Sequence, residues 1–239
     1  MATVLVLVGA GRYTDPWHDC AAQADEVVQV ARALGHDVRV RSTRPDTFDE
    51  ADLVARVPHL LVVVAGGTPG PQVLTDPSAD EAAARWRPFH DARHALVEAG
   101  TAVLALHQAA YAFTDDPRWA ATIGGRWVLD RSWHPPYGRA TVRPVDDEHP
   151  VTWSLGEVAV HDERYADLDV SPGVHVLAVT DVTPDEARGH GTPGTHPVVW
   201  TVPGATKVLY DALGHDARSW HAPSRRALLT AELAWLLQG

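Results

Sequence analysis

The chain has 239 residues, and its 20 Lys and Arg against 31 Asp and Glu give a formal charge of −11. Such an acidic balance argues against a nucleic-acid partner, whose phosphates require a basic surface. With 45% apolar and 21% charged residues, the chain can bury a full core. No apolar stretch approaches the ~20 residues that cross a bilayer, so no membrane partner is expected. We expect one domain spanning residues 1–239, because α/β folds of roughly this length often form one unit.

The first strand is expected at Thr3–Val8, a β-branched and leucine run typical of a strand covered on both faces. No Lys or Arg precedes this run and glycines end it early, so it is interpreted as a strand and not as a signal-peptide core. A helical stripe from Cys20 to Leu34 follows and ends at Gly35. Residues 38–40 alternate in polarity, which indicates a strand nearer the edge of a sheet.

A second unit of the same kind follows in the chain. Leu60–Ala65 is a buried-type strand, residues 82–99 form an amphipathic helix, and Thr101–Leu106 is strand-like again. Strands that alternate with helices predict a mostly parallel α/β sheet. We expect these two strands and Thr3–Val8 to end at one edge of it. Their predicted core residues are Leu5, Leu7, Val62, Val64, Val103 and Leu104.

From Gly124 onward the pattern is typical of shorter strands, before a final helix that carries a leucine face and begins near Pro223. Pro184–Pro197 is rich in Gly, Pro and His and is predicted to be an exposed loop. The shorter strands are expected at Thr141–Val145, Gly156–Val160, Val174–Thr180, Pro197–Val202 and Lys207–Tyr210.

The lone cysteine, Cys20, has no internal partner for a disulfide, which fits a reducing, cytoplasmic compartment. Its place in the first helical stripe predicts core packing. A serine or cysteine acyl-enzyme is disfavoured, because the chain has no G-x-S-x-G motif and its one thiol lies in this helix.

Ligands of an open parallel sheet bind beyond the carboxyl ends of its strands, so the residues that follow each strand are the candidates for a site. Gly9-Ala10-Gly11 there is a partial dinucleotide fingerprint that lacks the third glycine, since Thr14 stands in its place. The arginines after the second strand leave an NADP phosphate as an alternative, but no cofactor is predicted. Gly66 and Gly67, which follow another strand, are candidates for close approach to a substrate, although turns use glycine in any case.

His107 follows a strand of wholly buried type, at the turn where nucleophile-elbow enzymes place Cys or Ser. A histidine hydrogen-bonded in the core is the alternative. Gly214-His215-Asp216 follows the last strand and places an imidazole beside a carboxylate. Asp162–Tyr165 is a third polar group, for which a solvated charge run is the alternative.

These motifs, taken as an ordered set, resemble those of the trehalose-utilisation (ThuA-like) family. The resemblance is strongest from Leu104 to Trp235. Two departures are Ala205-Thr206-Lys207 in place of the usual Gly-Arg, and Glu163-Arg164-Tyr165 in place of Glu-Leu-Tyr. The matching motifs are His107, Gly124-Gly125 with His134-Pro135, Asp146–Thr152, Asp162–Tyr165, Pro197–Trp200, Val208–Asp216, and Trp220 with Pro223.

The resemblance implies a flavodoxin-like, class I glutamine-amidotransferase-like sheet with helices on both faces. His107 then occupies the turn where true amidotransferases carry their cysteine, so glutamine amidotransferase activity is not expected. It also implies a link to the utilisation of trehalose or a related disaccharide, particularly oxidised 3-keto sugars.

The leading hypothesis is therefore a carbohydrate-active hydrolase, lyase or isomerase that uses histidine acid–base chemistry. Its expected catalytic residues are His107, His215, Glu163 and Asp216, and its expected substrate-binding residues are Gly66, Gly67, Gln108, His134, Tyr165 and Trp220.

Two further hypotheses remain open at this stage. One places a divalent metal among His107, His134, Glu163 and His215, since imidazole and carboxylate suit Zn²⁺. The other is a non-catalytic binding or regulatory domain that kept the fold and lost the cysteine. The sequence does not decide whether the chain forms a homo-oligomer.

Overall fold

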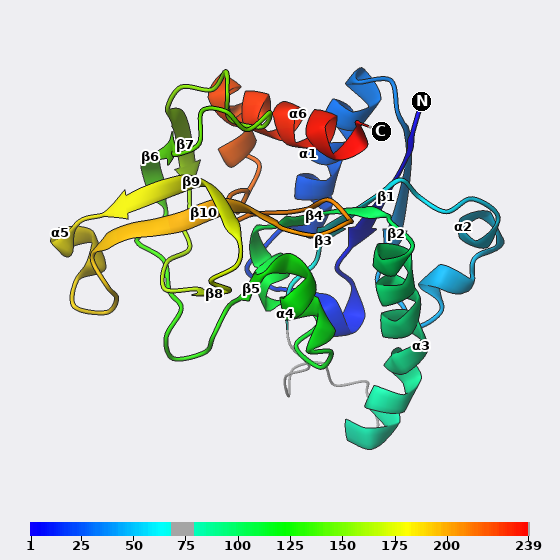
Figure 1. Ribbon diagram of the computed structural model, residues 1–239. Helices are drawn as coiled ribbons and strands as arrows, with labels where there is room; N and C mark the ends of the chain where they lie inside the picture. The colour runs from blue at the N-terminus through cyan, green and yellow to red at the C-terminus, as the bar shows by residue number, and fades with distance from the viewer. Residues whose placement is uncertain (68–78, 239) are drawn as a thin grey trace.

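A computed structural model describes residues 1–67 and 79–238 and shows one nine-stranded sheet among them, in the order β2-β1-β3-β4-β11-β10-β9-β6-β7 (Figure 1). A small two-stranded sheet, β5-β8, lies beside it. The strands are β1 Thr3–Val8, β2 Asp37–Ser42, β3 Leu60–Val64, β4 Ala102–Leu106, β5 Gly125–Arg126, β6 Gly138–Pro144, β7 Val158–Asp162, β8 Asp169–Val170, β9 His175–Val182, β10 Gly194–Val202 and β11 Val208–Asp211.

The parallel half of the sheet forms the centre of the core. β1 pairs in parallel with β2 and β3, and β4 pairs in parallel with β3 and β11. Every residue of β3 and β4 is buried, as their uninterrupted apolar sequences predict for strands covered on both faces. The expected common direction of β1, β3 and β4 is confirmed, and all six predicted core residues are fully buried.

Helices cover both faces of the sheet (Figure 1). Helices α1 and α6 lie together on one face, and α3 and α4 lie on the other. The α-helices are α1 Cys20–Ala33, α2 Ala51–Ala55, α3 Ala79–Glu98, α4 Arg118–Ile123, α5 Pro184–Ala187 and α6 Pro223–Leu237, and the short 3-10 helices are Gly11–Tyr13, Thr47–Asp49, His107–Tyr111 and Ser219–His221.

The second half of the sheet is antiparallel, and helix α6 packs against its outermost strand, β7 (Figure 1). The prediction of an exposed loop over Pro184–Pro197 is wrong at both ends. Thr183 forms a capping box with Glu186 and starts helix α5, while β10 begins at Gly194 and pairs with β9. Backbone pairing along a long neighbouring strand outweighed the local Gly and Pro content there.

A buried ionic group fixes the end of β11 to helix α6. Arg225 pairs with Asp211 and lies 4.2 Å from the centre of the Trp220 ring, and Glu232 lies beside the same carboxylate. Burial raises the pKa of Glu232 well above its ordinary value, so this side chain stays protonated and donates to Asp211. The contacts of Arg225 with Asp211 and Trp220 therefore hold the turn after β11 from within the protein.

Within the residues that the structure describes, no helix has the length and apolar character that crossing a bilayer requires.

Candidate functional site

A pocket of about 510 Å³ opens beyond the carboxyl ends of the parallel strands, where a ligand site is expected in such a sheet. Its lining combines aromatic rings with imidazoles and carboxylates, a composition suited to binding a small polar molecule. The lining residues are Asp15, Trp17, His18, Tyr111, Trp127, Leu129, His134, Glu163, Tyr165 and His215.

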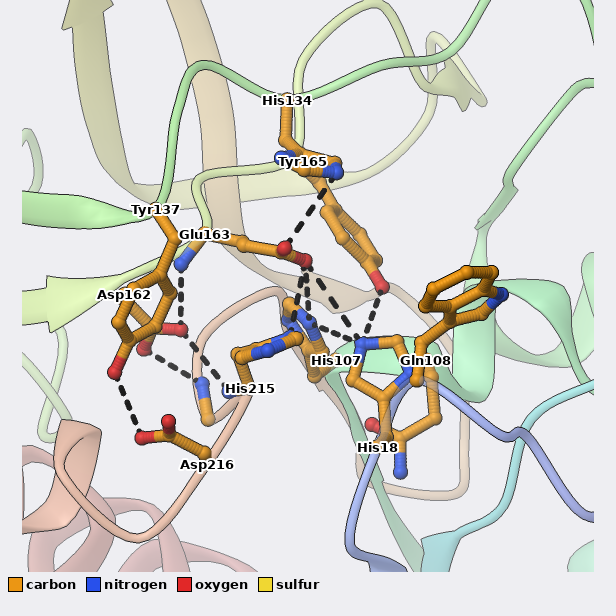
Figure 2. A network of polar contacts seen from close by, with 12 residues as sticks. His18, His107, Gln108, His134, Tyr137, Asp162, Glu163, Tyr165, His215 and Asp216 are labelled. Carbon is orange, nitrogen blue, oxygen red and sulfur yellow. Dashed lines mark hydrogen bonds and ion pairs between the residues drawn. The ribbon is translucent and has the colours of Figure 1, made fainter.

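His107 lies directly behind this lining, at the first position after β4 (Figure 2). Its backbone has a φ of +44°, a conformation that costs a non-glycine residue free energy and that is found at sharp functional turns. Nδ1 donates to the carbonyl of Ala212 over 2.7 Å, and the ring stacks on Tyr165 with 4.1 Å between centroids. These contacts fix the ring and leave Nε2 as the nitrogen that faces the site.

His18 faces His107 from the loop between β1 and helix α1 (Figure 2). Its Nε2 lies 3.0 Å from Nε2 of His107, and its Nδ1 lies 2.8 Å from a carboxylate oxygen of Asp15. Sequence reasoning missed both residues. The signal was Asp15-Pro16-Trp17-His18, a polar and aromatic segment at the end of the first strand, where only the glycines were considered.

Glu163 joins the histidines through both of its carboxylate oxygens (Figure 2). It follows β7, and its Oε2 lies 3.0 Å from His215 Nδ1, 3.8 Å from His107 Nε2 and 3.9 Å from His18 Nε2. The other oxygen, Oε1, lies 3.6 Å from His134 Nε2 at the rim. Glu163 is therefore the centre of the cluster and not part of a solvated charge run.

The turn that carries His215 is held by the neighbouring residue of Glu163, Asp162 (Figure 2). The Asp162 carboxylate accepts the backbone N–H groups of Gly214 and His215 at 2.8 and 3.0 Å. Gly214 has a φ of +120°, and a Cβ there would lie 2.7 Å from the Trp220 ring. Glycine is thus required for this turn, and the Asp162–Glu163 pair binds it on two sides.

The electrostatics of the site follow from burial and from this convergence. Burial opposes the charge on Glu163, but its contacts with His107 and His215 and the nearby His134 hold its pKa far below the ordinary value. Burial likewise opposes protonation of His215, yet the contact with Glu163 prevails and its pKa is raised. For His18 and His107 burial dominates, and both pKa values are lowered. The site therefore combines an ionised carboxylate and a readily protonated His215 with two neutral imidazoles, His18 and His107.

The structure places several of the predicted site residues elsewhere. Gln108 is fully buried and donates to Gln23, and Trp220 is fully buried against Arg225, so neither side chain lines the pocket. Asp216 turns from His215 to accept the Tyr137 hydroxyl and pair with Arg218.

The two candidate glycines also lie outside the pocket lining. A Cβ on Gly66 would lie 2.7 Å from Gln108 and 3.0 Å from Asp15, and Gly67 has a φ of +81°. Both serve close packing beside the site.

The predicted residues that the pocket does bring together are Glu163, His215, Tyr165 and His134, with His107 directly behind them. Burial raises the pKa of Tyr165 well above its usual range, so its hydroxyl stays protonated 3.4 Å from His18 Nε2. Trp127 packs on Tyr165 with 4.7 Å between ring centroids, and Trp17 is 80% exposed at the rim. Trp17 and Trp127, and not Trp220, are therefore the tryptophans that line the pocket.

One group of side chains can hold a metal ion in the described part of the chain. The ligand atoms of His18, His107, Glu163 and His215 all lie within 4.8 Å of one another. The hypothesised set had His134 in place of His18. His134 instead lies at the rim, against the other carboxylate oxygen of Glu163.

Comparison with protein-family models decides the family, since the model for ThuA, described as trehalose utilisation, matches residues 4–236. The chain belongs to the ThuA family. No curated protein matches this ThuA-family chain.

Several solved structures have a fold similar to that of this chain. A ThuA-like protein from Parabacteroides merdae is 17% identical, with a TM-score of 0.73 over 98% of this chain and 89% of that one. One from Bacteroides uniformis is 16% identical, with a TM-score of 0.67 over 99% and 91%. A glutamine amidotransferase from Thermotoga maritima is 10% identical, with a TM-score of 0.52 over 89% and 75%. The expected amidotransferase-like fold is thereby confirmed.

Proposed function

We propose that this ThuA-family protein is an enzyme of carbohydrate utilisation that removes a proton beside the ketone of an oxidised disaccharide. The observation that carries the proposal is the His215–Glu163 pair, joined over 3.0 Å in an aromatic-lined pocket. A proton beside a carbonyl requires a positioned base, and a group with a pKa near neutrality serves best. The raised pKa of His215 moves it in that direction.

The shape and composition of the pocket support a sugar as the substrate. Trp17, Trp127 and Tyr111 line the pocket, and aromatic rings are the groups on which the apolar face of a pyranose stacks. Asp15, His134 and Glu163 present hydrogen-bonding groups to hydroxyls. A volume of about 510 Å³ suits a molecule of the size of a disaccharide. The trehalose utilisation for which the family is named points to the same class.

The chemistry follows from the acid–base states of the site. Nδ1 of His215 faces Glu163, so Nε2 is the nitrogen that takes the proton from the carbon between the ketone and the glycosidic carbon. The C–H pair becomes the double bond of an enolate, and the carbonyl pair moves to oxygen. When the ketone reforms, the glycosidic C–O bond breaks, and the leaving oxygen takes the proton from His215. One keto-disaccharide then gives an unsaturated keto-sugar and a free sugar.

His107 does not take part in proton exchange in this proposal, contrary to the leading hypothesis from the sequence. Its ring is completely buried, and its Nδ1 proton is committed to Ala212. Amidotransferase chemistry is not proposed either, because a histidine stands at this turn. The only thiol, Cys20, is buried in helix α1 beside Gln108. With no second cysteine in the chain, a reducing, cytoplasmic location is the one we propose.

The test is turnover of a panel of disaccharides and their 3-keto derivatives, followed by NMR, with the parent and two variants. We expect the parent to convert a keto-disaccharide, His215→Gln to lose at least 100-fold in kcat/KM, and His175→Gln to match the parent. His175 is a matched control because it pairs with Asp146 on the surface. Binding of these sugars without conversion by the parent would contradict the proposal and favour a binding domain.

A further inference from the structure

The Nε2 atoms of His18 and His107 face each other in an arrangement that two neutral imidazoles do not favour. The Ala212 carbonyl can only accept, so His107 carries its proton on Nδ1, and the Asp15 carboxylate, 2.8 Å from Nδ1 of His18, favours the proton on that nitrogen. Each Nε2 then presents a lone pair to the other across 3.0 Å. A cation bound by both lone pairs removes this repulsion.

The carboxylate of Glu163 completes a triangle of ligand atoms. Its Oε2 lies 3.8 Å from Nε2 of His107 and 3.9 Å from Nε2 of His18, while the third side is 3.0 Å. A point equidistant from three atoms with these separations lies about 2.1 Å from each, and Zn–N and Zn–O bonds measure ~2.0–2.2 Å. The three side chains thus already stand at bonding distance from one common point.

The surroundings of the triangle have the other features of a metal centre. Ligating histidines usually donate their second N–H to a carboxylate or a backbone carbonyl; here His107 donates to Ala212, and Nδ1 of His18 lies 2.8 Å from the Asp15 carboxylate. Catalytic centres keep three protein ligands and an open position. His18 and Glu163 line the pocket, which supplies both an entry path and that open position.

We propose that His18, His107 and Glu163 bind one divalent transition-metal ion at the floor of the pocket, and that His215 remains a hydrogen-bond donor to Glu163. Two imidazoles and one carboxylate select Zn²⁺, Fe²⁺ or Co²⁺ over Mg²⁺ and Ca²⁺, which prefer oxygen ligands. The proposal rests on the proposed function for the use of the ion, which would polarise the ketone oxygen of the substrate. The ion's binding rests on the side-chain geometry alone.

The experiment is titration of the chelator-stripped, full-length protein with Zn²⁺ by calorimetry, with Co²⁺ absorption as a second signal. We expect one ion per chain. His18→Gln should weaken binding at least 100-fold, and because His18 lies in a loop, its replacement leaves the sheet intact. Asp15→Asn, which removes the charge beside Nδ1 of His18 and none of the three ligands, should weaken binding about 10- to 100-fold. His215→Gln should stay within about tenfold of the parent.

The matched control is His94→Gln, on helix α3, where the imidazole pairs with Glu98 away from the pocket. Its affinity should equal that of the parent, and circular dichroism should show every variant folded. Absence of one-to-one binding in the parent, or unchanged affinity in His18→Gln, would overturn the metal site. Loss of binding in His215→Gln as large as in His18→Gln would overturn the three-ligand assignment.

The outcomes separate this proposal from the proposed function, because binding is measured without substrate. Stoichiometric Zn²⁺ with no conversion of any keto-sugar would leave the metal site standing and contradict the substrate. Full turnover by the chelator-stripped protein would leave the sugar chemistry standing and contradict the role of the ion in polarising the ketone.

Discussion

His18 and His107 lie 89 positions apart in the chain, yet their Nε2 atoms are 3.0 Å apart beyond the carboxyl ends of β1 and β4. Parallel strands place their carboxyl ends at one edge, so residues that follow different strands meet there. Glu163 and His215 come to the same point from β7 and β11, which run in the same direction because four successive antiparallel pairings separate them in the sheet. Four separate segments therefore build one polar centre.

The first prediction concerns how His107 and His215 act together. If His107 holds the ion and His215 moves the proton, both residues are required for the same step. His107→Gln and His215→Gln should each lower kcat/KM by about 10²–10⁴, and the double variant should be little worse than the poorer single one. Steady-state kinetics on a keto-disaccharide measures this. Losses that multiply in the double variant would show that the two residues act independently.

The second prediction is that Cys20 has no part in the chemistry. Its side chain is buried in helix α1, and burial raises the pKa of its thiol, which makes it a poor nucleophile. Cys20→Ala should lower the free energy of unfolding by about 1 kcal/mol and keep turnover near the parent value. Urea unfolding and the keto-sugar assay give the two quantities. A folded Cys20→Ala protein without turnover would refute this assignment.

The third prediction tests the aromatic wall of the pocket. Trp127 lines the pocket beside Tyr165, whereas Trp153 is 69% exposed on another surface. Trp127→Ala should raise KM for the keto-sugar about tenfold, or ~1.4 kcal/mol, because a stacking face is lost. Trp153→Ala is the control and should leave KM unchanged. Equal effects of the two substitutions would argue against sugar stacking at Trp127.

The fold and part of the site could be predicted from the sequence because their signals are local. Continuous apolar runs such as Leu60–Val64 and Ala102–Leu106 are long enough to identify buried parallel strands. His107 was found because it directly follows β4, and His215 because it lies in the turn shortly after β11. Glu163 and Tyr165 were found through the family motif after β7.

The rest of the site depends on side-chain direction, which spacing does not reveal. Trp220 lies close to His215 in the chain, but its ring turns inward to Arg225 and fills the space that Gly214 leaves. Asp216 likewise pairs with Tyr137 and Arg218 and not with His215. His18 follows a 3-10 turn and not a strand directly, so neither periodicity nor the strand-end rule singled it out.

The fourth prediction concerns stability and pH through the buried group below the site. Glu232 has a raised pKa in the folded protein, so the folded state holds this proton when the unfolded state has lost it. Keeping Glu232 protonated in the folded state therefore costs more free energy as pH rises. The free energy of unfolding should fall as pH rises above about 4.5, the ordinary pKa of the group.

The test compares the parent with Glu232→Gln, whose amide can still donate to Asp211 but does not titrate. Between about pH 5 and pH 7 the parent should lose up to ~1.4 kcal/mol per pH unit relative to the variant. Urea unfolding at several pH values gives both curves. Parallel curves for the two proteins would mean that Glu232 is ionised in the folded state.

Hydrogen exchange at the carbon beside the ketone tests the account most directly. A 3-keto-disaccharide incubated with the protein in D₂O should lose the NMR signal of that C–H proton, or yield product labelled there, far faster than without protein. His215→Gln should lower this rate to the protein-free level, since no other residue is assigned to move the proton. Conversion of the sugar without any solvent deuterium in substrate or product, or exchange by His215→Gln at the parent rate, would contradict the account.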